Sequence, residues 1–281
     1  MIELPEANVL SQQINQALVG KNIASAVANA HPHSFAWYTG DPADYNGKLA
    51  GKKITGANPG TVYSCGGNVE ILCEDMLLVI STPIKYHAPA DKLPKSHQLL
   101  LTFEDDAHMS CTVQMWGSML CFPAGADEFP YDRGFVRNQV PSPYDDAFDE
   151  AYFTALWENA NPTASAKELL ATKQRIPGLG NGTLHDILWN AGIHPKRRLE
   201  SFAAGEQTRL YKSLKATMLA MKEQGGRNTE KDLFGQPGGY QSVLSPKTWK
   251  NPCPRCGGTI VRQAYLGGNV YFCPQCQPMD D

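Results

Sequence analysis

The chain has 281 residues, of which 42% are hydrophobic and 19% charged, and its formal net charge is −3. This size and apolar content predict about two globular domains, and so small a net charge indicates no polyanion partner by itself. No run of about 18 apolar residues exists to span a bilayer, and the N-terminus, with Glu3 and Glu6, lacks a signal peptide's apolar core. We therefore expect a cytoplasmic protein without a membrane partner.

A helix followed by short strands is predicted for the first half of the chain. Leu10, Ile14 and Leu18 recur at four-residue spacing, which predicts a helix that ends near Gly20. From about residue 53 to residue 122, β-favouring runs alternate with clusters of Gly, Asp, Pro and Asn, a pattern typical of an antiparallel sandwich or barrel. The predicted strands cover residues 69–72, 76–80, 98–103, 109–115 and 118–122.

Helical periodicity begins after a loop rich in Pro, Asp and Tyr at residues 124–145. Pro162 and Gly192 separate the predicted helices, which indicate an α-helical second domain. A glycine-rich connector at residues 225–239 then leads to the C-terminal segment, and we expect a long loop there, ordered or mobile. The predicted helices cover residues 146–159, 165–172, 183–191 and 206–224.

Two Cys-Pro-x-Cys pairs lie near the C-terminus: Cys253 with Cys256, and Cys273 with Cys276. Their separation is typical of two short strands that close over one metal ion. Four thiolates favour a closed tetrahedral zinc site, in which the metal stabilises the fold and performs no chemistry. Disulfides or a thioredoxin-like redox motif are the alternatives, but one redox site does not need two matched pairs.

The remaining cysteines lie in strand-like segments at spacings that match no common metal template. Free cysteine behaves as a small hydrophobic residue, so buried thiols are favoured over ligands or disulfides. These residues are Cys65, Cys73, Cys111 and Cys121.

Two features of the second half would suit contact with phosphates. Residues 175–182, Arg-Ile-Pro-Gly-Leu-Gly-Asn-Gly, precede a predicted helix, and glycines there let a partner approach and leave amides free at the positive end of the helix dipole. A plain helix-turn-helix corner that needs glycine for packing is an equal alternative. Between residues 246 and 279 every charged side chain is basic, which also suits phosphates. These side chains are Lys247, Lys250, Arg255 and Arg262.

Taken in order, the opening Glu3-Leu4-Pro5-Glu6, the β-rich half, residues 178–195 and the cysteine pairs resemble the formamidopyrimidine-DNA glycosylase and endonuclease VIII family over the whole chain. The resemblance implies an α+β fold: an N-terminal antiparallel β-sandwich with a flanking helix, a helical domain with a helix-two-turn-helix motif, and a zinc-finger β-hairpin. We expect the domains at residues 1–130, 145–240 and 245–281. The resemblance also implies a monomer that clasps damaged double-stranded DNA and extrudes a base for excision.

The resemblance further implies roles for individual residues. Asn181 matches a residue that contacts a phosphate beside the lesion, and Glu3 matches a carboxylate that acts as general acid or base at the sugar. The residues alone also allow Glu3 to be a surface acid in the first turn of a helix. Trp116 matches an aromatic that fills the gap left by the extruded base, and it would stack between bases or be an ordinary core aromatic.

The nucleophile of the family is absent from this sequence. The family uses the amine of a proline at the second position, which removal of the initiator methionine exposes, whereas this chain has Ile2. The candidate amines are therefore those of Met1 or, if Met1 is removed, of Ile2, which would form an imine as a primary amine.

Three further positions depart from the family. Asn68 stands where the resemblance implies a lysine on the sheet, and Gly268 or Asn269 stands where it implies a finger arginine that holds the phosphate beside the lesion. Gln174 replaces a lysine ahead of the glycine-rich turn. The two neighbours that would substitute there as phosphate contacts are Lys173 and Arg175.

The matches and departures lead to two hypotheses of different classes. The first is a base-excision DNA glycosylase in which Glu3 activates water or assists an N-terminal amine, acting on oxidised or ring-opened bases with impaired AP-lyase activity. The second is a catalytically degenerate family member that binds damaged or distorted DNA without excising a base. RNA or protein binding by the same scaffold is a third and less favoured reading.

Overall fold

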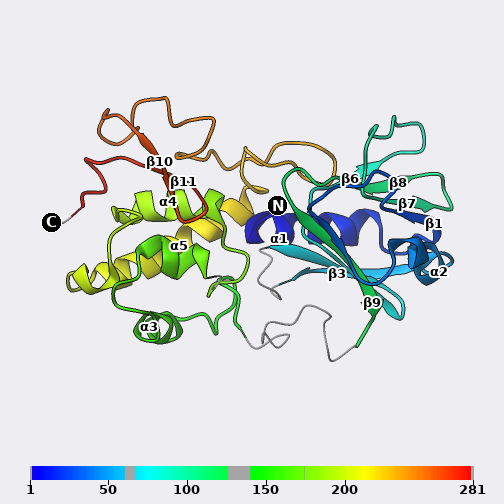
Figure 1. Ribbon diagram of the computed structural model, residues 1–281, viewed down its shortest axis with the longest axis horizontal. Coiled ribbons are helices and arrows are strands. Elements are labelled where there is room, and N and C mark those ends of the chain that lie inside the picture. Colours follow the sequence, from blue (N-terminus) through cyan, green and yellow to red (C-terminus); the bar gives the residue numbers. More distant parts are fainter. Residues whose placement is uncertain (1, 61–66, 126–139, 174, 280–281) are drawn as a thin grey trace.

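The computed structural model describes residues 2–60, 67–125, 140–173 and 175–279. Figure 1 shows two lobes, one mostly of strands and one mostly of helices, with the start of the chain at their junction. Helix α1, Leu4–Ala17, runs from this junction along the sheet lobe, where it packs on two strands of the larger sheet. The first helix therefore connects the two lobes, as well as flanking the sheets.

The sheet lobe is a sandwich of two sheets. The four-stranded sheet is antiparallel throughout, and in the five-stranded sheet only the edge strand β2 pairs in parallel, with β9. A short 3-10 turn, η1 (Pro42–Asp44), and helix α2 (Tyr45–Leu49) join β2 to β3. The first sheet has the order β1 (Ile23–Ala28), β7 (Leu99–Phe103), β8 (His108–Cys111), β6 (Ile84–His87), and the second has the order β2 (Ala36–Tyr38), β9 (Gly117–Pro123), β5 (Met76–Ile80), β4 (Asn68–Cys73), β3 (Ile54–Gly60).

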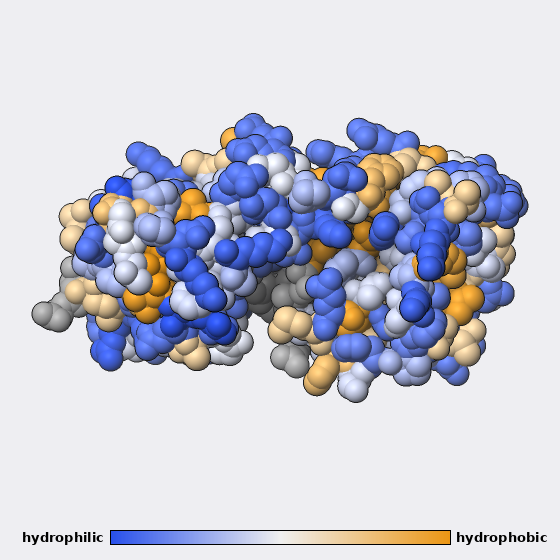
Figure 2. Space-filling view, turned by 90° about the horizontal axis from the view of Figure 1, so that it is seen from above, coloured by the Kyte–Doolittle hydropathy of each residue, from blue (hydrophilic) through white to orange (hydrophobic). Residues whose placement is uncertain are grey.

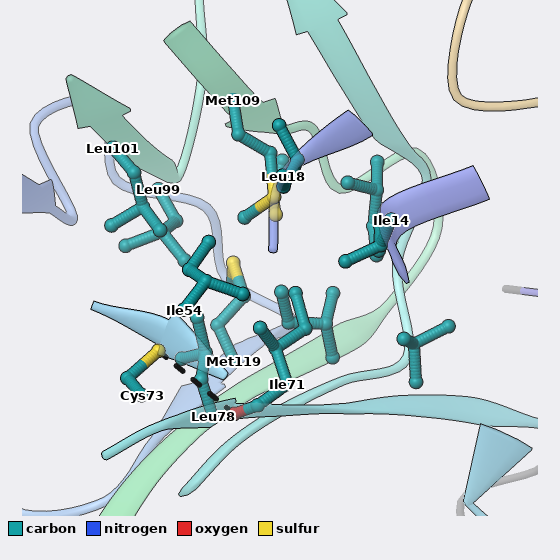
Figure 3. Packing of buried hydrophobic residues seen from close by; sticks show 14 of the residues in the cluster. Ile14, Leu18, Ile54, Ile71, Cys73, Leu78, Leu99, Leu101, Met109 and Met119 are labelled. Carbon is teal, nitrogen blue, oxygen red and sulfur yellow. Dashed lines mark hydrogen bonds between the residues drawn. The ribbon is translucent and has the colours of Figure 1, made fainter. Parts of the chain in front are cut away.

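The core of the sandwich contains the apolar face that the sequence predicted for α1. Leu10 and Ile14 of α1 and Leu18 just beyond it are at most 1% exposed. Figure 3 shows Ile14 and Leu18 together with residues of both sheets, such as Leu101 and Leu78. All five predicted strands are found, β5 with the predicted bounds and the other four with shifted ends, whereas β1, β2, β3 and β6 were not predicted. Tyr86 and His87 lie in β6.

The helical lobe contains α3 (Glu150–Glu158), α4 (Asn181–Ala191) and α5 (Glu206–Glu223). The predicted start of the first of these helices at residue 146 is wrong, because Asp149 caps it by accepting a hydrogen bond from the Tyr152 backbone N–H at 2.7 Å. The predicted helix at residues 165–172 consists mainly of a π-helical turn, η2 (Glu168–Thr172), and the 3-10 turn η3 (Leu199–Ser201) follows α4.

Two residues, one near the N-terminus and one in the connector, pack in the core of the other lobe. Leu4 packs with the helical core although it precedes the sandwich, and Leu233 of the connector packs with the sandwich core. The connector is ordered: bridges join Arg227 to Tyr240 and Lys231 to Pro237. The predicted domain boundaries stay predictions, but the two lobes exchange core residues across them.

The C-terminal segment forms an antiparallel hairpin of β10 (Val261–Tyr265) and β11 (Gly268–Phe272). Gln277 donates a hydrogen bond from Nε2 to the Ile193 carbonyl oxygen at 2.8 Å, and the Phe272 ring lies 4.2 Å from that of His194. The finger is therefore fixed to the end of α4. Among the described helices, none has the length and apolarity that crossing a bilayer requires.

Candidate functional site

The Glu3 carboxylate caps the N-terminus of α4. Its Oε1 accepts a hydrogen bond from the Gly182 N–H at 2.9 Å, and its Oε2 accepts from the N–H groups of Gly180 at 3.2 Å and Thr183 at 2.9 Å. The Thr183 hydroxyl donates to the same oxygen. A helix N-terminus favours an anion, and here that anion is a side chain of the protein itself. We call the site formed by Glu3, residues 180–183 and Arg227 the Glu3 corner.

The glycines of the turn before α4 are required by this close packing. Gly178 has a φ of +76°, its carbonyl oxygen accepts from the Leu4 N–H at 2.9 Å, and a Cβ there would lie 3.1 Å from the Leu4 Cβ. A Cβ on Gly180 would lie 2.5 Å from the Glu3 carboxyl carbon. The packing interpretation is therefore confirmed, and the expectation that these amides are free for a phosphate is wrong for Gly180, Gly182 and Thr183.

Arg227 completes the corner from the connector. Its side chain is 3% exposed and its Nη1 lies 3.5 Å from Glu3 Oε1, while its Nη2 donates to Glu6 Oε2 at 2.8 Å and its Nε to Glu6 Oε1 at 2.9 Å. Two buried carboxylates thus share one buried guanidinium, which can donate in a bidentate manner. No sequence motif marked Arg227 as a site residue, although the Gly225-Gly226 pair before it indicates a backbone that turns sharply.

The charges at the corner keep Glu3 ionised. Burial opposes ionisation, but the Arg227 charge and the hydrogen bonds from Thr183 and Gly182 outweigh it, so the pKa of Glu3 lies below its usual value. Burial lowers the pKa of neighbouring His185 to about 4, which leaves that imidazole neutral at pH 7. At neutral pH the Glu3 carboxylate is therefore ionised and the His185 ring is neutral, so neither is a proton donor for catalysis.

Ile2 lies between the sandwich core and a polar hollow. The Ile2 side chain is 3% exposed and packs with the sandwich core, while its backbone N–H donates to the Ser81 carbonyl oxygen at 3.4 Å. Ile2 also lines a cavity of about 390 Å³ between β6, β8 and the connector. We call this cavity the polar hollow; Lys85, Gln114 and Lys231 line it as well. Met1 lies outside the described residues.

Asn68 is buried and faces another strand. It begins β4 opposite Gly60 of β3 and is 1% exposed. A Cβ on Gly60 would lie 1.6 Å from Asn68 Oδ1, so the amide fills the space above that glycine. The basic groups near residue 2 are instead Lys85 and Lys231, which line the polar hollow. The sequence did not indicate them, because the strand of Lys85 and the loop of Lys231 lie far from residue 2 along the chain.

The tip of the finger hairpin meets the start of α4. A Cβ on Gly268 would lie 2.8 Å from Asn181 Nδ2, and the Asn269 backbone hydrogen-bonds to His185 of α4. The buried Lys167 donates to the Tyr265 carbonyl oxygen and also holds the tip. The structure thus brings together Asn181 and the tip that carries Asn269, two of the predicted DNA-contacting positions.

The other predicted contacts are more dispersed. The Lys173 side chain is 61% exposed, and its Nζ lies 3.8 Å from Glu168 Oε1, a surface pair of little energetic weight. Arg175 is half-buried in the turn before α4, and Gln174 lies outside the described residues. Trp116 is half-buried in the loop before β9, with its ring 5.7 Å from that of Trp37.

The four finger cysteines have the geometry of a zinc site. Their Sγ atoms all lie within 4.8 Å of one another, with Cys253 to Cys276 at 3.8 Å and Cys256 to Cys273 at 3.4 Å. A tetrahedron with Zn–S bonds of about 2.3 Å has S···S edges of about 3.8 Å, so the thiols fit the ion. Elsewhere, Cys73, Cys111 and Cys121 are buried free thiols as predicted, and Cys65 lies outside the described residues.

Comparison with known proteins agrees with this arrangement. Residues 250–278 match the family model described as "Zinc finger found in FPG and IleRS", and the cysteine cluster holds one structural zinc ion. A formamidopyrimidine-DNA glycosylase from Enterococcus faecalis is 26% identical over 285 residues, which cover 99% of this chain and 98% of that protein. The corresponding protein of Acidothermus cellulolyticus is 27% identical over 288 residues, with the same coverage of both chains.

Solved structures share the fold. A complex between Lactococcus lactis Fpg and DNA containing an abasic site superposes with a TM-score of 0.77 at 23% identity, covering 98% of this chain and 99% of that one. The MutM (Fpg) protein from Thermus thermophilus superposes with a TM-score of 0.77 at 21% identity, covering 99% and 100%. The α+β fold with antiparallel sheets and a C-terminal four-cysteine finger is thereby confirmed.

Proposed function

Because this chain belongs to the formamidopyrimidine-DNA glycosylase family, we propose that it is a DNA glycosylase of base excision repair. It binds damaged double-stranded DNA as a monomer in the cytoplasm and releases an oxidised or ring-opened base. The observation that carries the proposal is the convergence of Glu3, Asn181 and the zinc-finger tip at one corner, on a chain similar to glycosylases over its full length.

Asn181 and the finger tip supply the DNA contacts in this proposal. The Asn181 amide stands at the exposed side of the corner, beside Gly268, and can donate to a phosphate oxygen while Glu3 occupies the helix amides behind it. Lys173 and Arg175 add charge along the same turn. Since phosphate contacts position the duplex without reading its sequence, these groups serve affinity more than lesion choice.

The polar hollow is the place for the extruded base. Its volume of about 390 Å³ lies within the range of small-molecule sites, and it mixes hydrogen-bonding groups with the apolar Ile2. A base bound there would place its sugar near residues 2 and 3. The ionised Glu3 would then stabilise positive charge that develops on the sugar as the base leaves, and assist attack by water or by the amine of Met1 or Ile2.

Strand cleavage is impaired in this proposal. Elimination requires a covalent imine. The family resemblance implies residues that form this imine or hold the phosphate beside the lesion, and their positions here carry Ile2, Asn68 and Gly268 or Asn269. While Met1 is attached, the Ile2 nitrogen is a peptide nitrogen that donates to Ser81, and a peptide nitrogen does not attack a sugar. Base release without strand cleavage is therefore the expected reaction.

One observation favours a second function, damage binding without excision. Both oxygens of Glu3 already accept hydrogen bonds, and Arg227 pairs with the same carboxylate. A carboxylate held so firmly is suited to stabilising the fold as well as to catalysis. A catalytically degenerate protein would keep the corner and the finger for recognition and mark the damaged site for other proteins.

The test is incubation of the purified protein with duplexes that carry oxidised or ring-opened bases or abasic sites. Base release is measured by chromatography, strand cleavage on denaturing gels, and imine formation by borohydride trapping, with intact mass reporting whether Met1 is retained. We expect base release that is lost in Glu3→Gln and weakened in Asn181→Ala. It should be unchanged in Asn159→Ala, because Asn159 is an exposed residue at the C-terminal end of α3.

The outcomes separate the two functions. Binding to damaged duplexes without release of any base, by a protein whose melting curve and zinc content are normal, rejects the glycosylase and leaves the binding protein. Release that persists in a folded Glu3→Gln variant removes Glu3 from the chemistry. Absence of duplex binding at low ionic strength rejects both functions.

A further inference from the structure

An exposed aromatic hollow lies beside the polar hollow. Phe35, Trp37, Met115 and Trp116 line a cavity of about 400 Å³, which we call the aromatic hollow. Phe35 is 56% exposed, Trp37 42% and Met115 75%, so three of the largest exposed apolar side chains of the described residues gather at one place. Clustered exposure of this kind indicates a binding surface, because single exposed apolar residues need no partner but a patch of them does.

The aromatic hollow is firmly built. Trp37 belongs to the edge strand β2, which pairs in parallel with β9, and the Phe35 carbonyl oxygen accepts from the Gly117 N–H at 2.9 Å. The Trp37 and Trp116 rings meet edge to face at 65° with centroids 5.7 Å apart. Backbone pairing thus holds the two segments together, while the Trp37 and Met115 side chains remain exposed.

The chemistry of the lining selects a flat, aromatic ligand. Indole and phenyl faces stack on planar rings, and a flexible thioether adapts to the edge of such a ring. Four side chains are far fewer than the roughly 20–30 residues per partner of a stable protein interface, which disfavours a second copy of the chain. A nucleobase has the required shape, and any of the four bases presents a face to stack.

Position connects the aromatic hollow to DNA binding. Gln114 lines the polar hollow beside Ile2, and the next residue, Met115, lines the aromatic hollow. The loop at residues 112–116 therefore forms the wall between the two cavities. A duplex positioned with one base in the polar hollow would bring its neighbouring or opposite bases to the other side of this wall.

We propose that the aromatic hollow binds a second, unpaired nucleobase by stacking on Trp37, so that the protein prefers DNA with locally unpaired bases. This inference rests on the proposed binding of DNA but not on excision. It assigns Phe35 and Trp37 a role separate from Trp116, because these two exposed rings receive a base outside the helix, whereas the half-buried Trp116 packs edge to face against Trp37. The preferred substrate class is then DNA with a mismatch, bubble or single-stranded gap beside the lesion.

The test compares two oligonucleotides of one sequence, with 2-aminopurine in a two-base bubble or in a fully paired duplex. Stacking quenches 2-aminopurine fluorescence, so we expect quenching in the bubble and tighter binding of the bubble by wild type. Since a base that stacks on an aromatic ring adds to the affinity for unpaired DNA, Trp37→Leu should weaken bubble binding by about 10-fold and paired-duplex binding by less than 2-fold. Trp37→Phe should restore most of the quenching, and Leu219→Ala, on an exposed side chain of α5, should change neither.

Several results would overturn this inference. Equal affinity of the wild type for bubble and paired DNA, or equal loss of both in a folded Trp37→Leu variant, rejects the stacking site while leaving the glycosylase proposal intact. A wild-type dimer in sedimentation that Trp37→Leu dissociates identifies the aromatic hollow as an interface between copies instead. Failure to bind bubble, single-stranded or paired DNA rejects the site together with the proposed function.

Discussion

Replacing Arg227 by methionine should destabilise the protein strongly, and in a pH-dependent way. The variant keeps most of the side-chain volume but leaves the carboxylates of Glu3 and Glu6, 8% and 4% exposed, without their shared cation. Removing one partner of a buried ion pair typically costs about 3–5 kcal/mol, because the remaining charge stays buried. At about 2–4 °C per kcal/mol for domains of this size, the melting temperature should fall by roughly 6–20 °C at pH 7.

The pH dependence provides the sharper check. In the wild type the pKa of Glu3 lies below its usual value, so its contribution to stability is present above the unfolded-state pKa and is lost as pH falls through the folded-state pKa. In Arg227→Met, burial acts without the opposing cation and the folded-state pKa of Glu3 rises. A protonated carboxyl needs no guanidinium, so the cost of the substitution should be largest at pH 7 and shrink as pH falls toward 4.

Urea unfolding of the wild type and the variant at pH 7, 5.5 and 4 measures this cost. Arg209→Met is the matched control, because Arg209 pairs with Glu206 but its side chain is 50% exposed, and such surface pairs contribute about 0–1 kcal/mol. A cost for Arg227→Met no larger than that of the control, or one that is the same at pH 7 and pH 4, would refute the account of the Glu3 corner given above.

Three further predictions concern the zinc, the turn and His185. One zinc ion per chain should be found by elemental analysis, and its chelation should unfold the finger and abolish duplex binding while the circular dichroism of the strands persists. Gly180→Ala should cost about 1–3 kcal/mol in urea unfolding, because its Cβ would lie 2.5 Å from the Glu3 carboxyl carbon, and four hydrogen bonds hold that carboxyl in place. The control is Gly47→Ala, which has open space around it and should cause no clash. Burial lowers the pKa of His185 from an ordinary 6.5 to about 4, so the folded protein disfavours the protonated ring. The free energy of unfolding should therefore be highest above pH 6.5 and fall by about 3 kcal/mol as pH falls toward 4. His185→Gln should remove most of this acid-side loss, and an unchanged pH profile of unfolding would contradict the prediction.

Local patterns predicted the parts of the fold that local interactions determine. The cysteine spacing identified the zinc finger, and the run at residues 76–80 was assigned as a strand with the bounds that β5 has. By contrast, β2 is only three residues long and depends on parallel pairing with β9, far along the chain. No periodicity is visible in so short a segment, so its pairing partner, and with it the aromatic hollow, could not be predicted.

The site required contacts that no local pattern contains. Glu3 meets Thr183 at a sequence separation of 180 residues, and Arg227 meets Glu6 at a separation of 221. The sequence identified Glu3 as a candidate catalytic residue through family resemblance, but not its role as the cap of α4. The turn glycines were recognised as a close-approach motif, but the sequence left open whether the approaching group was a phosphate or part of the protein.

Two groups at or near the Glu3 corner, Asn68 and Arg227, bear on the departures from the family. Asn68, at the position where the resemblance implies a lysine, is buried and uncharged. Without a cation beside Glu3, burial would raise the pKa of this carboxyl, because a buried carboxyl favours its neutral form. Arg227 supplies that cation from the connector and fixes Glu3 in its ionised form. A fixed guanidinium cannot relay protons as an amine can, since arginine does not deprotonate in proteins. The corner therefore keeps Glu3 ionised through a group that cannot shuttle a proton, which is in keeping with the proposed release of a base without strand cleavage.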